Sequence, residues 1–90
     1  MIKSYRDKRL KSLMVKGDWK GLPPDLVKKI KIRLERIDTA RDIGDIGVRD
    51  LHELKGDREG TWAVKISGNW RVTFEFIDGD AYDVNLEDYH

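Results

Sequence analysis

From Trp62 to Leu86, apolar and polar residues alternate with a period of two, which is the pattern of β-strands with one buried and one solvated face. Two turn signals, Ser67-Gly68-Asn69 and Asp78-Gly79, divide this stretch into three segments, and the Asp-Gly pair predicts a tight hairpin. We therefore expect an antiparallel meander. Its apolar face comprises Trp62, Val64, Ile66, Trp70, Val72, Phe74, Phe76, Tyr82, Val84 and Leu86. Its polar face comprises Lys65, Arg71, Thr73, Glu75, Asp83 and Asn85.

Two segments before the meander have the helical spacing needed to cover its apolar face. Asp7 is suited to cap a first helix that stops near Gly17, and Pro23-Pro24-Asp25 is suited to open a second. The first helix has an apolar side made of Leu10, Leu13 and Met14. The second has an apolar side made of Leu26, Val27, Ile30, Leu34 and Ile37, and an outer basic stripe made of Lys28, Lys29, Lys31 and Arg36.

The expected fold is α+β, with two N-terminal helices packed on one face of a small antiparallel β-sheet. Ile2, Ser4 and Tyr5 can form a short first strand, and residues 39–50 are expected to form a loop with a short turn near Asp42 to Asp45. The 90 residues are expected to form a single domain, 1–90, with a modest core, because a domain this short buries only roughly 60–65 % of its unfolded surface. A site on such a domain would be a shallow cleft or an open sheet face.

Several classes of protein and site are disfavoured. The chain has no cysteine, which excludes disulfides and thiolate metal sites and fits a cytoplasmic location. Met1-Ile2-Lys3-Ser4 leads into charged residues rather than a signal-peptide segment, and no apolar run reaches the length of a membrane span. The two histidines match no compact metal-ligand spacing, and no P-loop glycine pattern is present. We therefore expect no metal, no organic cofactor and no membrane association.

Charge is segregated along the chain, although the formal net charge is only +1. Residues 1–36 contain twelve Lys and Arg against four Asp and Glu, a net charge of +8. Residues 72–90 contain six Asp and Glu and no Lys or Arg, a net charge of −6. The basic half indicates a polyanionic partner such as nucleic acid. The alternative is that the two halves neutralise each other in the fold, and the charge pattern does not separate these interpretations.

Four residues are candidates for chemistry on such a partner. Arg71 lies beside a turn, keeps its charge at any working pH and can hold a phosphate through two parallel N–H groups. His52 and His90 carry the chain's two imidazoles, whose ordinary pKa lies near neutrality, and Lys55 adds a cation close to His52 in the sequence. Each also has a structural interpretation, because polar sheet faces carry ordinary ion pairs, lone histidines are common on surfaces and chain ends fray.

Several runs of residues occur together in an order and spacing that specify a family. They are His52-Glu53-Leu54-Lys55-Gly56-Asp57-Arg58, Ser67-Gly68-Asn69-Trp70-Arg71-Val72-Thr73-Phe74, Asp78-Gly79-Asp80-Ala81-Tyr82 and Glu87-Asp88-Tyr89-His90, with Met1-Ile2-Lys3-Ser4 and Gly21-Leu22-Pro23-Pro24 before them. Together they resemble the HigB toxins of the RelE-like superfamily of type II toxin–antitoxin systems, over essentially the whole chain. The resemblance implies a RelE-like microbial ribonuclease fold, in agreement with the pattern of helices and strands.

The resemblance also implies a function and partners. It implies a ribosome-dependent endonuclease that enters the A site of the 30S/70S ribosome, cuts the mRNA there and stops translation. It further implies a HigA-type helix-turn-helix antitoxin, through which the complex would bind operator DNA. Two alternatives remain open: a non-catalytic RelE-like module that binds antitoxin and operator DNA, and a ribosome-independent ribonuclease.

Residue by residue, the resemblance assigns the site to His52, Lys55, Arg71, Asp88, Tyr89 and His90. Metal-independent cleavage by attack of the ribose 2′-OH on the adjacent phosphate needs a base, an acid and cations. His52 and His90 are the acid–base candidates, and Asp88 can orient an imidazole or act as the base. Arg71 and Lys55 would stabilise the phosphate charge, and Tyr89 would stack on a base or bind the phosphate.

Two further expectations concern residues beside this site. Lys28, Lys29, Lys31 and Arg36 are expected to contact ribosomal RNA, with a solvated helix face as the alternative. Glu53 departs from the family pattern, because many relatives have proline there. The extra negative charge beside His52 is expected to modulate the rate.

Overall fold

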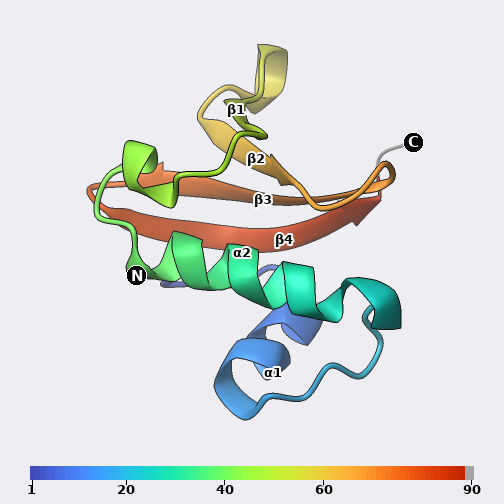
Figure 1. Ribbon diagram of the computed structural model, residues 1–90. Helices are drawn as coiled ribbons and strands as arrows, with labels where there is room; N and C mark the ends of the chain where they lie inside the picture. The colour runs from blue at the N-terminus through green and yellow to red at the C-terminus, as the bar shows by residue number, and fades with distance from the viewer. Residues whose placement is uncertain (89–90) are drawn as a thin grey trace.

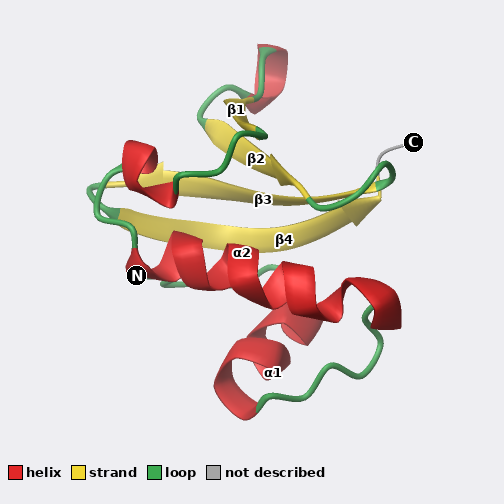
Figure 2. Cartoon of the chain, viewed as in Figure 1, coloured by secondary structure: helices red, strands yellow, loops and turns green. Residues whose placement is uncertain are grey.

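The computed structural model describes residues 1–88, and within them a four-stranded antiparallel sheet packs against two α-helices (Figure 1 and Figure 2). The strands lie in the order β1-β2-β3-β4. Their bounds are β1 Leu51–Glu53, β2 Thr61–Lys65, β3 Trp70–Ile77 and β4 Asp80–Asp88. The helices are α1 Lys8–Lys16 and α2 Val27–Thr39, and both lie on the same side of the sheet (Figure 1). The predicted α+β fold is therefore confirmed.

The helices begin and end at the predicted signals. The Asp7 carboxylate accepts a hydrogen bond from the backbone N–H of Arg9 at 2.9 Å and so caps α1. Gly17 ends α1 with a left-handed φ of 72°, a conformation that glycine adopts without strain. A 3₁₀ turn, η1 (Pro24–Leu26), precedes α2 and places Pro24 in a first turn, where its missing N–H costs nothing.

The core lies between α2 and the sheet. Ile30, Leu34 and Ile37 of α2 are fully buried, and burial of each such side chain contributes about 1.5–3 kcal/mol. The sheet supplies Val64, Val72, Phe74, Val84 and Leu86 to the same cluster, and Ile66 joins it directly after β2. Trp62 and Trp70 are partly buried against this cluster, as the alternation predicts, whereas Trp19 is half-exposed.

A β-bulge in β4 corrects one detail of the predicted sheet. Near the hairpin turn Glu75 pairs with Tyr82, but beyond the bulge Thr73 pairs with Asn85, so β4 contains one extra residue. Asp83 lies at the bulge, and its backbone has a left-handed φ of 54°. Tyr82 was predicted on the apolar face and this is wrong, because its pairing places it beside Glu75 on the polar face. The hairpin instead buries Ala81 against the core.

The remaining segments extend or close the sheet. The N-terminal segment forms isolated parallel bridges to β4 at Ile2 and Tyr5, where a short strand was predicted. The strand β1 was not predicted, and its residue His52 pairs with Ala63 of β2. The predicted turn in the loop after α2 is a 3₁₀ turn, η2 (Ile43–Ile46). No helix in the described part of the chain is long and apolar enough to cross a membrane.

Candidate functional site

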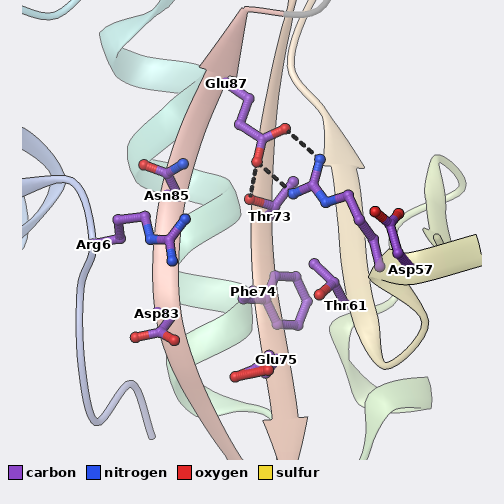
Figure 3. A pocket seen from close by; sticks show the side chains of 10 residues that line it. Arg6, Asp57, Thr61, Thr73, Phe74, Glu75, Asp83, Asn85 and Glu87 are labelled. Carbon is purple, nitrogen blue, oxygen red and sulfur yellow. Dashed lines mark hydrogen bonds and ion pairs between the residues drawn. The ribbon is translucent and has the colours of Figure 1, made fainter.

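A hollow of about 200 Å³ lies on the polar face of the sheet, on the side away from the helices (Figure 3). Glu87 and Thr73 lie at one end of it and Glu75 and Asp83 at the other. Its lining residues are Arg6, Asp57, Arg58, Thr61, Thr73, Phe74, Glu75, Asp83, Asn85 and Glu87. The lining is mostly polar and charged, so the hollow suits a hydrogen-bonding ligand rather than an apolar one.

Glu87 connects two arginines at one end of this hollow. Its Oε1 accepts hydrogen bonds from Nη1 of Arg58 at 3.1 Å and from Nε and Nη2 of Arg71 at 3.3 and 3.1 Å. Its Oε2 accepts from Nη2 of Arg58 at 2.6 Å and from the Thr73 hydroxyl at 3.1 Å. Arg71, Thr73 and Glu87 share the polar face because Arg71 pairs with Glu87 across β3 and β4. Arg58 reaches them from the 3₁₀ turn η3 (Gly56–Arg58).

The network determines the charge state of Glu87. Hydrogen bonds from Arg58, then from Arg71 and Thr73, lower the pKa of Glu87 from 4.5 to about 2 although partial burial opposes this. The carboxylate in turn raises the pKa of Arg58. At neutral pH the site therefore carries two positive charges, on Arg58 and Arg71, and one negative charge, on Glu87. Thr73, predicted on an open polar face, is only 3 % exposed beneath them.

His52 shares the polar face with this network but lies two strands away. It pairs with Ala63 of β2, which pairs with Thr73 of β3, so the three side chains point to the same face. Two strand spacings amount to about 10 Å. The His52 imidazole is exposed, and its Nδ1 lies 3.2 Å from the carbonyl oxygen of Asp50.

Lys55 lies outside the main hollow. It is exposed at the start of η3 and lines a second, shallower hollow with Glu53, Leu54, Gly56 and Glu59. Glu53, at the position where the resemblance led us to expect proline, accepts a hydrogen bond from the backbone N–H of Gly60 at 3.0 Å. This bond ties β1 to the far end of the loop that carries Lys55 and Arg58. Glu53 therefore has a structural role that proline could not perform.

The remaining predicted residues are Asp88, Tyr89 and His90 at the C-terminal end and the basic stripe on α2. Asp88 is exposed at the end of β4, where it pairs with Trp70 and so points to the opposite face from its neighbour Glu87. Tyr89 and His90 lie outside the described residues. The basic stripe of Lys28, Lys29, Lys31 and Arg36 is exposed on α2. Because α2 covers the apolar face of the sheet, this stripe is not part of the site around Arg71.

The two oppositely charged halves of the chain do not neutralise each other through extensive pairing in the described part. Within residues 1–88 the one ion pair between them joins the exposed Met1 amino group to the partly exposed Asp80 at 3.4 Å. The acidic C-terminal segment instead contributes Glu87 to Arg58 and Arg71, from the middle of the chain. No group of three His, Asp or Glu side chains in this part of the chain is placed to hold a metal ion.

Comparison with known proteins identifies the family. The family model for HigB-like toxins, described as RelE-like toxins of the type II toxin–antitoxin system HigB, matches residues 3–90. The chain belongs to the HigB-like toxin family. It is also 52 % identical to Endoribonuclease HigB of Proteus vulgaris over 92 aligned residues, which cover the whole of both chains. As a HigB-like toxin of a type II system, the chain has an antitoxin as its partner.

Two residues of this HigB-like toxin's site were not singled out from the sequence. Arg58 was interpreted as part of a charged turn, and Glu87 was noted only as the start of a family motif. A signal for Glu87 was present in its alternation with Leu86, which places it on the polar face with Asn85. No comparable signal existed for Arg58, because its position depends on how the η3 loop folds over the sheet.

Proposed function

We propose that this HigB-like toxin is an endoribonuclease that cleaves mRNA in the ribosomal A site and so inhibits translation. Support comes from its family membership and from the full-length similarity to a protein named Endoribonuclease HigB. The observation that carries the proposal is the polar sheet face with two arginines held side by side at Glu87. Guanidinium groups bind phosphate bidentately and keep their charge, as a phosphodiester substrate requires.

The proposed chemistry is a metal-independent transfer within the RNA. A base removes the proton of the ribose 2′-OH, the 2′-oxygen forms a bond to the adjacent phosphorus, and the bond from phosphorus to the 5′-oxygen breaks. An acid protonates the departing 5′-oxygen, which leaves a 2′,3′-cyclic phosphate and a 5′-hydroxyl. Arg71 and Lys55 would stabilise the extra negative charge that develops on the phosphate.

The proposed acid and base are drawn from His52, His90 and Asp88. His52 and His90 suit these roles because an imidazole gains and loses a proton near neutral pH. The resemblance gives Asp88, which points to the opposite face from Glu87, the role of orienting one imidazole or serving as the base, and Tyr89 would stack on a base or bind the phosphate. The exposed His52 ring, on the face that carries Arg71, is consistent with access to the same nucleotide.

The proposed partners are the ribosome and a HigA-type helix-turn-helix antitoxin. Lys28, Lys29 and Lys31 would attract ribosomal RNA phosphates from the helical side of the molecule, away from the mRNA site. Replacing all three by glutamine should weaken ribosome binding and reduce its salt dependence by about one unit of log–log slope per lost phosphate contact. An unchanged slope would remove this stripe from the ribosome interface.

A direct test compares mRNA alone with mRNA on 70S ribosomes. The purified toxin should cut the ribosome-bound mRNA at the A-site codon and leave the same mRNA intact without ribosomes, as read by mapping the new 5′ ends. Arg71→Ala should lose cleavage, whereas Arg41→Ala, at an exposed arginine on the loop after α2, should retain it. Cutting without ribosomes would identify an independent ribonuclease. No cutting in either case would favour a non-catalytic antitoxin-binding module.

A further inference from the structure

Glu87 joins two arginines that come from different parts of the chain. Arg58 is 29 residues away from Glu87 and Arg71 is 16 residues away, yet both donate to its Oε1. Arg58 donates through both Nη atoms, one to each carboxylate oxygen, which is the strong bidentate arrangement. Glu87 therefore fixes both the position and the plane of the Arg58 guanidinium.

Arg71 is held in a different way, through a single carboxylate oxygen of Glu87. Its Nε and Nη2 both donate to Oε1, so Nη1 is not engaged by Glu87. The Thr73 hydroxyl donates to Oε2 and anchors the carboxylate itself to the floor of the sheet. The side chains of Arg71 and Glu87 are 19 % and 20 % exposed, so both are largely shielded but not fully buried, and Glu87 lines the hollow together with Arg58.

Without the Glu87 carboxylate between them, the two positively charged guanidinium groups would repel each other. The repulsion between like charges is stronger where a protein surface partly excludes water than in bulk water. With Glu87 in place, the three groups carry a net charge of +1 and a defined geometry. A cluster of this kind matches a phosphate whose negative charge increases during the reaction.

We propose that Glu87 is a positioning residue that holds Arg58 and Arg71 together as a two-arginine clamp for the RNA phosphate. This inference rests on the proposed nuclease function and adds Arg58 as a second phosphate-binding group. Glu87 does not act on the RNA as a base, because a carboxylate with its pKa lowered to about 2 accepts a proton poorly at neutral pH. Glu87 contributes to cleavage by orienting the two arginines.

The negative charge of Glu87 should weaken RNA binding, whereas its hydrogen bonds to the arginines should speed cleavage. A variant that loses both therefore distinguishes a positioning role from a purely electrostatic one. Glu87→Gln removes a negative charge from the site, so RNA binding should stay the same or become tighter. The same change removes the bonds that orient the arginines, so cleavage should slow by on the order of 10- to 100-fold. A general loss of folding would instead weaken binding and cleavage together.

The experiment measures both quantities on mRNA-programmed 70S ribosomes. Cleavage is followed in single turnover at saturating ribosome concentration. Affinity is measured on the same ribosomes carrying an mRNA with 2′-O-methyl groups across the A-site codon, since these block attack by the 2′-oxygen. Glu87→Gln should cleave slowly with undiminished affinity. Glu35→Gln, the same change at an exposed residue of α2, should match the wild type in cleavage.

Two further variants keep the test decisive if Glu87→Gln unfolds. Glu87→Asp keeps the charge but draws the carboxylate back by one methylene, and it should also slow cleavage. Arg58→Lys keeps the charge but loses the bidentate fork, and it should slow cleavage as well. Wild-type cleavage rates in Glu87→Asp or in Arg58→Lys would overturn the clamp. A wild-type protein that never cleaves would refute the proposed function instead, so the two failures are distinguishable.

Discussion

The pKa of Glu87 leads to a prediction about stability that needs no RNA. Its value falls from 4.5 to about 2 because Arg58, and then Arg71 and Thr73, donate hydrogen bonds to the carboxylate. A group whose pKa is lowered in the folded state stabilises the fold when it is ionised. Glu87 therefore stabilises the protein fully above pH 4.5, and this contribution is lost as the pH falls toward about 2.

The size of this contribution follows from the change in pKa. A tenfold change in proton affinity corresponds to about 1.4 kcal/mol, so the full change would correspond to about 3 kcal/mol. One-fifth of the Glu87 side chain is open to water, and its partner Arg58 is 41 % exposed. Solvent screening of this kind lowers the expected contribution to the free energy of unfolding to about 1–2 kcal/mol.

The assay is urea unfolding of the wild type and Glu87→Gln at several pH values, followed by tryptophan fluorescence. At pH 7 and pH 5 the wild type should be more stable by about 1–2 kcal/mol, with the difference constant between these two values. By pH 3 the difference should fall to about half or less, because below pH 4.5 the unfolded chain takes up a proton at Glu87 whereas the folded protein, with its pKa of about 2, mostly does not. Asp7, whose pKa is also lowered, titrates equally in both proteins and cancels from the difference.

The control is Glu75→Gln, which makes the same change on the same sheet face. The Glu75 carboxylate makes no hydrogen bond or ion pair within residues 1–88. The difference in unfolding free energy between the wild type and this variant should be small, because the Glu75 carboxylate makes no such bonds. A pH-independent difference for Glu87→Gln, or equal stability at pH 7, would refute the assignment of the two arginine bonds.

Three further predictions concern the site, a helix cap and a turn. His90→Ala should abolish growth inhibition in cells that lack antitoxin while leaving the far-ultraviolet circular dichroism unchanged, and full toxicity would remove this imidazole from the site. Asp7→Ala should lower the unfolding free energy by about 1 kcal/mol through loss of the α1 cap, whereas Asp7→Asn should lose less in the same urea titration. Gly79→Ala should lower the thermal midpoint, with a cost of roughly 1–2 kcal/mol, since φ is +84° and an added Cβ would lie 3.0 Å from the Arg41 carbonyl oxygen. An unchanged midpoint would show that the hairpin turn relaxes.

The site was only partly predictable. Arg71 was singled out correctly as a polar-face residue, because the alternation along β3 specifies its face. Its partners were not predicted, because they come from a loop and from another strand. The assignments of His52, Lys55, Asp88, Tyr89 and His90 to RNA cleavage stay predictions, for which the activity assays are the test.

The bulge in β4 was in principle readable from the sequence. A regular ladder from the Asp78-Gly79 turn would place Val72 opposite Asn85, and so an amide on the apolar face. One extra residue removes this conflict by pairing Val72 with Leu86. The same shift brings Arg71 opposite Glu87, so the register that buries the core also builds the arginine network.

By itself, the sequence determined both helices, the strands β2 to β4 and the layers of this HigB-like toxin, but not the strand β1. Helix caps, turn residues and hydrophobic periodicity act between near neighbours, so they can be read along the chain. Only the tertiary structure decided that Arg58 and Arg71 share one carboxylate. That contact depends on the strand register and on the path of the η3 loop over the sheet, which the packing of the whole domain selects among many locally acceptable arrangements.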